Sequence, residues 1–211
     1  MHAIYHHIGD QLPLRQVIDE THELTAGGGT LNVFLANHAL RRGHRVSIYT
    51  YNLDLFDPSW FTAEGVDLAE RLRTQARIKR HDEKLQLVTR GYLEFLERGG
   101  QLKFEDLTSQ LLHRFLDRGQ PLLTGLSATY LYRQVREDAA NNVEDDVAGS
   151  PVGHFVVLCG YDRESDTLQV ADPYRHNPMD EGHYYAVRSE RLIGAILLGI
   201  VTHDANLLVI E

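Results

Sequence analysis

Cysteine is nearly absent from this sequence: Cys159 is the only one in 211 residues. A single thiol excludes an internal disulfide framework, and it excludes a zinc site built from several cysteines. Such sparing use of cysteine is typical of a reducing compartment. We therefore expect a cytoplasmic protein.

Long apolar runs are also missing. No uninterrupted stretch approaches the roughly 18 apolar residues of a transmembrane helix, and the N-terminus lacks the basic and then apolar pattern of a signal peptide. The apolar segment at residues 195–201 is short and is predicted to be a buried strand. We therefore expect no membrane partner.

Positive charge is in deficit. The chain has 21 lysines and arginines against 30 aspartates and glutamates, which gives a formal net charge of -9. A nucleic-acid-binding domain usually carries a basic surface, so we expect no nucleic-acid partner. With 43% hydrophobic residues, the chain can bury roughly 70% of its unfolded surface in one core, so a single domain over residues 1–211 is predicted.

Helical and extended patterns concentrate in different halves of the chain. Helical spacing of apolar residues predicts two charged amphipathic helices between residues 62 and 99, and further helices at residues 1–9, 14–23, 31–42 and 108–118. Alternating or continuous apolar segments predict strands at residues 44–51, 121–126, 153–161, 167–171, 183–187 and 195–201. This order favours an α+β fold, with a helical N-terminal half packed on an antiparallel β-sheet from the C-terminal half.

The segment from Gly153 to Asp172 is the most informative one for chemistry. A short turn between its two strands would place His154 within about two positions of the point opposite Asp172, so the two side chains could meet. A carboxylate bonded to an imidazole fixes its tautomer and stabilises the imidazolium, as the general base of a nucleophile requires. His154 and Asp172 are thus candidate catalytic residues. The alternative is that each has a local structural role. Trp60 and residues 127–132 are further candidates to line a cleft.

Cys159 does not suit the role of nucleophile. It lies five residues from His154 in the same predicted strand, and an odd offset places two side chains on opposite faces of a sheet. At about 3.3 Å per residue the two side chains would be roughly 16 Å apart. We expect Cys159 to be a small, buried and unreactive core residue.

The His and Asp segments resemble those of a known family. Residues 154–162 read His-apolar-Val-apolar-apolar-x-Gly-Tyr-Asp, and after a turn residues 170–173 read apolar-x-Asp-Pro. These two segments resemble those of the bacteriocin-processing (double-glycine leader) cysteine peptidases. The first half also resembles that family, which has a helix of the x-Pro-Leu-x-x-Val-Ile kind, a Gly-Thr loop and a helix closing as Arg-Arg-Gly. The corresponding segments are at residues 12–18, 29–30 and 39–43.

The resemblance implies a papain-like cysteine-peptidase fold. It also implies a Cys/His/Asp mechanism without a cofactor, in which His154 is the base and Asp172 orients it. The family's Gln and Cys-Gly-Pro would fall before Met1, because residues 2–9 correspond to the second half of the helix that the family's Cys begins. We therefore expect an N-terminally incomplete domain. The cause would be a misassigned start codon, a truncation or a true loss of the catalytic segment. The chain as given is expected to be inactive.

A different alignment places Thr-Ala-Gly at residues 25–27 where Cys-Gly-Pro belongs. It describes a degenerate enzyme whose nucleophile has been replaced. It leaves the helix at residues 12–18 and the Gly-Thr loop without counterparts.

Metal binding is a further alternative at two places. His2, His6 and Asp10 fall at i, i+4 and i+8 of a helix and could bind a divalent metal, as in a metal-dependent hydrolase. The acidic segment at residues 141–150 is predicted to be a surface loop. Calcium binding there is disfavoured because the EF-hand spacing is absent.

The leading functional hypothesis is a cysteine-peptidase-like protein that hydrolyses or transfers a peptide amide in its complete form. The alternative is a non-catalytic pseudopeptidase that holds a peptide in the same cleft without cutting it. Both predict a peptide or protein tail as substrate or ligand. The sequence does not identify the peptide, the scissile bond or the oligomeric state.

Overall fold

The computed structural model describes the chain except for residues 22–28, 139 and 203–204. The helices of the described part are α1 (His2–His7), α2 (Leu14–Glu20), α3 (Asn32–Arg41), α4 (Leu68–Ile78), α5 (Glu83–Glu97), α6 (Ser109–Leu116), α7 (Ala128–Tyr132) and α8 (Ser189–Leu198), with 3-10 turns η1 (Pro58–Phe61) and η2 (Gly199–Thr202). The strands are β1 (Val46–Thr50), β2 (Gln101–Lys103), β3 (Leu122–Ser127), β4 (Gly153–Asp162), β5 (Thr167–Ala171), β6 (Tyr184–Arg188) and β7 (Asn206–Ile210).

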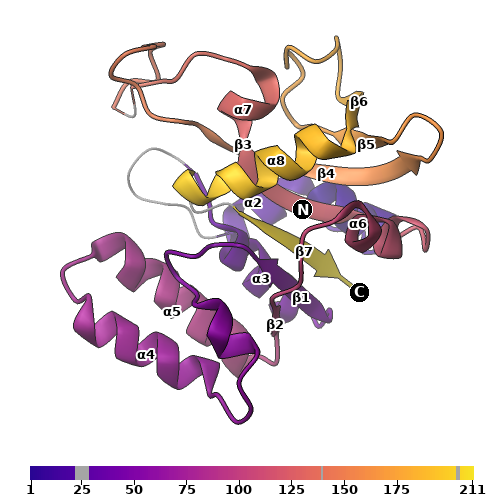
Figure 1. The fold of residues 1–211 in the computed structure, drawn as a ribbon. Coiled ribbons are helices and arrows are strands. Elements are labelled where there is room, and N and C mark those ends of the chain that lie inside the picture. Colours follow the sequence, from indigo (N-terminus) through magenta and orange to yellow (C-terminus); the bar gives the residue numbers. More distant parts are fainter. Residues whose placement is uncertain (22–28, 139, 203–204) are drawn as a thin grey trace.

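These strands form one sheet of seven strands within the described residues, in the order β2-β1-β7-β3-β4-β5-β6. The β1–β2 pair is parallel. Every other neighbouring pair is antiparallel. Helices cover the sheet, with α8 crossing in front of it and α3 behind it in Figure 1. The α+β class and the mainly antiparallel sheet were predicted correctly, although β1 and β2 show that the first half of the chain also contributes strands.

The prediction of a strand at residues 195–201 is wrong. These residues belong to α8 and η2, where Ala195 and Ile196 are buried while Leu197 and Leu198 are exposed. A short apolar run fits a buried strand and a buried helix equally well, because its periodicity does not separate them. The strand that the sequence analysis missed is β7, which lies in the middle of the sheet between β1 and β3.

Two hydrophobic cores lie on the two faces of the sheet. One contains Ile48 and Leu208 with side chains from α1 to α5, and Trp60 packs at its edge. The other contains Val156 and side chains from α6, α7 and α8. Alternate residues of each strand point to opposite faces, so a single sheet serves both cores. None of the helices described is both long enough and apolar enough to cross a membrane.

Helices α3 and α5 make a close contact through Gly91. A Cβ atom at this position would lie 2.8 Å from Cγ1 of Val33 and 2.9 Å from Cε1 of Phe34. The amide nitrogen of Asn37 also donates a hydrogen bond of 2.9 Å to the carbonyl oxygen of Gly91. The absence of a side chain at Gly91 therefore sets the separation of the two helices.

This contact predicts the effect of replacing Gly91 with alanine. Alanine is favoured over glycine inside a helix by about 1 kcal/mol. We nevertheless expect Gly91→Ala to lower the free energy of unfolding by about 1–3 kcal/mol, because the new methyl group overpacks a buried contact. Urea unfolding measures the change, with Lys84→Ala on the exposed face of α5 as the control. A stabilised Gly91→Ala variant would contradict the close contact.

Candidate functional site

His154 and Asp172 meet at one end of the sheet. Val157 pairs with Ala171 in the β4–β5 ladder, so Asp172 follows opposite Val156, two positions from His154. Nε2 of the imidazole lies 2.8 Å from Oδ1 of the carboxylate. The predicted contact between these two side chains is confirmed. The turn between β4 and β5, together with a bulge at Cys159, sets the register that makes it.

The carboxylate of Asp172 is fully buried and accepts four hydrogen bonds. Oδ1 accepts from His154 at 2.8 Å and from the backbone N–H of Tyr174 at 2.8 Å. Oδ2 accepts from the hydroxyl of Tyr185 at 2.9 Å and from the hydroxyl of Tyr132. Each oxygen thus has two donors, which is what a buried charge needs in place of water.

These donors decide the charge of Asp172. Burial by itself raises the pKa of the carboxyl group, but the hydrogen bonds from His154, Tyr132 and the N–H of Tyr174 outweigh burial and hold the pKa below its usual value. Burial and the neighbouring carboxylate raise the pKa of the hydroxyls of Tyr132 and Tyr185. Asp172 is therefore a carboxylate, and the two tyrosines remain donors.

The carboxylate fixes the tautomer of His154. An ionised carboxyl group only accepts hydrogen bonds, so Nε2 of the imidazole carries the proton that Asp172 receives. This leaves Nδ1 as the nitrogen with a lone pair. The side chain of His154 is 22% exposed, whereas that of Asp172 is fully buried. Nδ1 is thus the basic nitrogen of a partly exposed imidazole, and the carboxylate that orients this ring is closed to solvent.

The elements around the pair hold it in place. Leu126 of β3 lies opposite His154, and Ser127 caps the start of α7 by accepting from the N–H of Tyr130 at 3.3 Å. Helix α7 in turn carries Tyr132 to the carboxylate. On the other side, Nδ1 of His183 donates to the carbonyl oxygen of Asp172 at 2.8 Å. Four segments of the chain thus converge on one aspartate.

The sequence analysis did not identify the two tyrosines that bond to Asp172. Tyr132 lies in the segment proposed to line a cleft, and Tyr185 is a buried residue of β6, where burial alternates with exposure. A tyrosine on the buried face of a strand needs a partner for its hydroxyl group. That need is visible in the sequence, but the identity of the partner depends on how the strands pair.

Cys159 is exposed, so the prediction that it is buried is wrong. The predicted alternation holds as far as Leu158, because Val156 and Leu158 pack in one core while Phe155 and Val157 pack against the other, and a bulge at Cys159 then interrupts it. The residues that cover Phe155 and Val157 do not extend over Cys159. Desolvation still raises the pKa of its thiol, and Sγ lies 3.5 Å from the carbonyl oxygen of Gln169.

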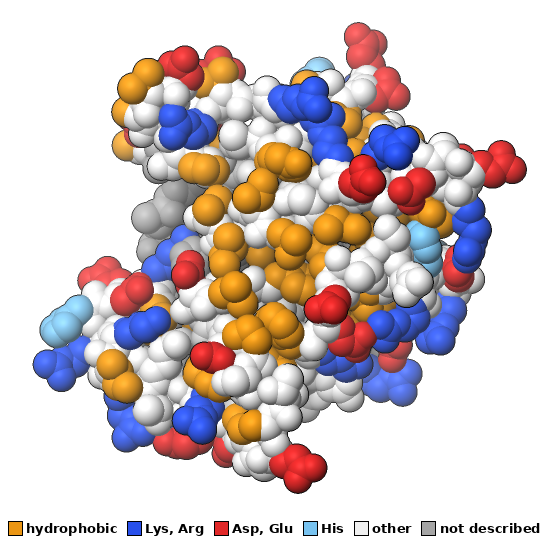
Figure 2. All heavy atoms as spheres, viewed as in Figure 1, with side chains coloured by type: hydrophobic (Ala, Val, Ile, Leu, Met, Phe, Trp, Pro, Cys, Tyr) orange, Lys and Arg blue, Asp and Glu red, His pale blue; other side chains and the backbone are white. Residues whose placement is uncertain are grey.

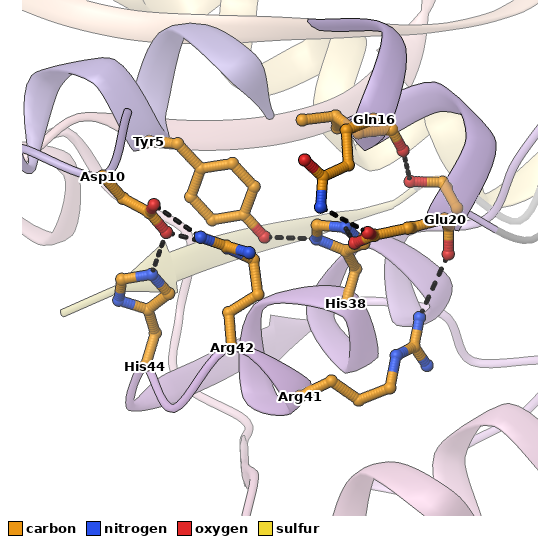
Figure 3. Close-up of polar contacts among 10 residues, drawn as sticks. Tyr5, Asp10, Gln16, Glu20, His38, Arg41, Arg42 and His44 are labelled. Carbon is orange, nitrogen blue, oxygen red and sulfur yellow. Dashed lines mark hydrogen bonds and ion pairs between the residues drawn. The ribbon is translucent and has the colours of Figure 1, made fainter. Parts of the chain in front are cut away.

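A second polar cluster joins α1, α2 and α3 (Figure 3). The hydroxyl of Tyr5 lies 2.6 Å from Nδ1 of His38, and Nε2 of His38 lies 3.1 Å from Oε2 of Glu20. Burial lowers the pKa of His38. Both ring nitrogens are occupied within the protein and the ring is buried, so this histidine serves structure and offers no base to a ligand.

The metal site considered for His2, His6 and Asp10 is not assembled. Helix α1 ends at His7, and the carboxylate of Asp10 is bonded to Arg42 at 2.6 and 2.8 Å and to His44 at 3.0 Å (Figure 3). Among the residues that the structure describes, no group of three histidine, cysteine, aspartate or glutamate side chains is placed to hold a metal ion. Residues 25–27, where the alternative alignment places the active-site turn, lie outside the described part.

Comparison with known proteins adds independent evidence. A family model, that of the Peptidase_C39 like family, matches residues 79–192, a segment that holds both His154 and Asp172. The chain belongs to this family. Its α+β fold is therefore the papain-like fold that the sequence predicted, and the protein is cysteine-peptidase-like.

The similarity of the chain to solved structures is low. A crystal structure from Bacillus anthracis, described as that of a C39-like peptidase, matches at 19% identity with a TM-score of 0.28. The match covers 48% of this chain and 46% of that one, so it spans less than half of either. No curated protein matches the chain.

The buried carboxylate predicts a pH dependence of stability. The pKa of Asp172 is lower in the folded than in the unfolded chain, so the unfolded chain takes up its proton first as pH falls. The stabilisation is therefore complete above the ordinary aspartate pKa of 3.8 and is lost as pH falls through the folded-state value. We expect Asp172→Asn to cost about 3 kcal/mol at neutral pH, as for a broken buried pair, and less below about pH 4.

Urea unfolding of both proteins between about pH 3 and pH 7 measures this difference. Asp117→Asn is the control, because Asp117 forms an exposed ion pair with Arg163 and its loss should cost little at any pH. A cost of Asp172→Asn that did not change with pH would contradict an ionised Asp172.

The thiol of Cys159 should be slow to react although it is exposed. The thiolate is the reactive form, and the raised pKa of Cys159 lowers its thiolate fraction near neutral pH. We expect a thiol reagent at pH 7.5 to label the native protein more slowly than the urea-unfolded chain, with the difference narrowing as pH rises above about 9. Equal rates at pH 7.5 would contradict this prediction.

Proposed function

We propose that His154 and Asp172 are the general base and the orienting carboxylate of a cysteine-peptidase site that cleaves or transfers a peptide amide. Nδ1 of the imidazole removes the thiol proton, the thiolate attacks the peptide carbonyl, and the same imidazole returns the proton to the leaving amine. The observation that carries the proposal is the bond of 2.8 Å between Nε2 and a buried, ionised Asp172. This bond leaves Nδ1 directed away from the carboxylate.

In this proposal the attacking thiol is not Cys159. That residue lies five positions from His154 along β4, at the bulge beyond Leu158, and its pKa is raised rather than lowered. A reactive thiol needs a lowered pKa, and the positive end of a helix dipole is one source of it. We infer that the thiol belongs to a segment outside the 211 residues, at the N-terminal end of the helix that α1 continues.

One contact places the C-terminal end of α1 near the start of β3. Nε2 of His7, at the C-terminal end of α1, lies 2.8 Å from the carbonyl oxygen of Gly119, just before β3 begins. Because β3 and β4 are antiparallel, the start of β3 lies beside Leu158, and the end of β3 lies beside His154. A segment that continued α1 in the N-terminal direction would leave from the helix end opposite Gly119.

A groove beside the pair supports peptide binding. It has a volume of about 620 Å³, and Ser127, Tyr130, Pro151, Leu198 and Val201 are among the residues that line it. Ser127 pairs with Gly153, the neighbour of His154 in β4, although neither His154 nor Asp172 lines the groove itself. Hydrophobic side chains gather over α8 in Figure 2. Concave, mainly apolar surfaces of this size are typical of ligand sites.

The second candidate function is peptide binding without cleavage. The observation that favours it is that the described residues bring no thiol to Nδ1 of His154, whereas the groove and the oriented imidazole are both present. In this alternative the imidazole is a hydrogen-bonding group for the peptide backbone. The peptide partner is common to both functions, and the thiol distinguishes them.

The proposal predicts the reactivity of an extended protein. The frame upstream of the Met1 codon should encode a Cys-Gly-Pro with a Gln a few residues before it. With Cys159→Ser as the background, the extended protein should bind one equivalent of a peptide that ends in an electrophilic group. His154→Ala should slow this reaction by at least about 100-fold, because general-base catalysis contributes that much. Mass spectrometry of the labelled protein measures it.

Two controls separate the candidates. The 211-residue Cys159→Ser chain should remain unlabelled, and Glu190→Gln at the groove should not change the pH dependence of labelling as His154→Ala does. An in-frame stop codon directly before Met1, or an added cysteine that is inert, would reject the peptidase proposal. Saturable binding of a fluorescent peptide to the unextended chain would then favour the pseudopeptidase.

A further inference from the structure

Charge is unevenly distributed along this acidic chain. Residues 68–98, which span α4 and α5, hold 8 of the 21 basic residues and 5 of the 30 acidic ones. This helical hairpin therefore carries a formal charge of +3, while the rest of the chain carries -12. Figure 2 shows lysine and arginine side chains over α4 and α5, at the lower left of the view, with acidic side chains among them. A basic surface on so acidic a protein calls for an explanation beyond solubility.

The basic residues of the hairpin meet in a groove between α4 and α5. The groove has a volume of about 860 Å³ and is lined by Glu70, Arg73, Ala76, Arg77, Arg80, Gln86, Thr89, Arg90 and Leu93. Four arginines and one glutamate leave it a formal charge of +3. Ala76 and Leu93 add apolar surface. All of its cationic groups are guanidinium groups, which bind the oxygens of phosphate groups two at a time.

The helices place these groups by simple spacing. Arg73 and Arg77 lie at i and i+4 on one face of α4, and Arg80 follows in the turn after the helix ends at Ile78. The amide of Gln86 donates to the carbonyl oxygens of Ala76 at 2.9 Å and of Lys79 at 3.2 Å, which fixes α5 against the end of α4. Because the hairpin is antiparallel, the same register brings Arg90 of α5 across from Arg73. Like charges therefore face each other.

The single acidic side chain of the groove does not neutralise it. Glu70 lies 3.1 Å from a guanidinium nitrogen of Arg77 and 3.9 Å from one of Arg73. Nε of Arg80 donates only to the neighbouring His81, at 3.3 Å. Repulsion between unneutralised arginines on facing helices is unfavourable, and a bound anion would relieve it.

Thr89 supplies an observation that is independent of charge. Its side chain is 2% exposed, it lines the groove, and its Oγ1 has no hydrogen-bond partner. A buried hydroxyl without a partner costs about 1–3 kcal/mol. In a groove lined with arginines, such a hydroxyl is a donor available to an anionic oxygen.

We propose that the groove between α4 and α5 binds a small anion with two or more linked phosphate groups. Linked phosphates concentrate three or four negative charges in a small volume, which matches the +3 of the groove's lining better than the separated carboxylates of an acidic peptide do. The arginines bind the phosphate oxygens, the hydroxyl of Thr89 donates to one of them, and the apolar surface accommodates any organic group attached. This site is separate from the His154–Asp172 site and does not depend on the function proposed there.

Calorimetric titration of the 211-residue protein with pyrophosphate and with ADP tests the proposal. We expect one saturable site for at least one of the two probes. Tighter binding of ADP indicates a nucleotide-like ligand, and equal binding indicates that the diphosphate alone is recognised. Arg73→Gln and Arg90→Gln should each weaken binding about tenfold, the effect of one charge-assisted hydrogen bond. Arg71→Gln, on α4 but outside the groove, is the matched control and should leave the affinity within about twofold.

Thr89→Val separates a built site from general charge attraction. Removing an unpartnered hydroxyl should leave the protein at least as stable in urea, yet binding should weaken severalfold. The proposal is overturned by the absence of saturable binding at low salt. It is equally overturned if Arg71→Gln weakens binding as much as Arg73→Gln does, or if an oligoglutamate peptide of equal charge competes on equal terms.

Discussion

A single buried charge organises the candidate site. The carboxylate of Asp172 is removed from water, and an isolated carboxylate in such a place would be strongly unfavourable. It is tolerated because donors from β4, β6, α7 and the loop after β5 converge on its two oxygens. The need to satisfy this charge therefore holds together elements that are distant in the sequence.

The same arrangement separates the roles of two neighbouring side chains. Asp172 is fully buried and fixed by four bonds, so it orients but does not meet a ligand. His154 is partly exposed and is bonded to Asp172 through one nitrogen. Placing the anion behind the imidazole gives a base that is oriented before any substrate arrives. This preorganisation is common to a peptidase and to a peptide-binding relative, which is why the thiol alone distinguishes the two proposed functions.

The helical hairpin of α4 and α5 is less constrained by the burial of apolar side chains than the sheet is. The sheet and its covering helices bury apolar side chains on both faces, whereas α4 has only Leu72 fully buried. Its outer surface is free to carry charge, and that charge is opposite in sign to that of the rest of the protein. Gly91 fixes α5 on α3, and Gln86 fixes the end of α4 on α5, so the arginines of the groove are held on a rigid support.

The sequence by itself determined the local patterns and whatever follows from short-range geometry. The amphipathic helices, most of the strands and the contact of His154 with Asp172 were predicted correctly. A short turn brings His154 and Asp172 close on neighbouring strands, and the bulge at Cys159, which only the structure shows, shifts their register by one residue. The helix at α8 and the strand β7 were not predicted, since a short apolar run has no period that separates helix from strand. Only the tertiary structure decided that Cys159 is exposed, that Tyr132 and Tyr185 bond to Asp172, and that the arginines of residues 73–90 face one groove. Each of these features depends on how different segments of the chain pack together. The free energy of the whole core determines that packing, and no local pattern reports it.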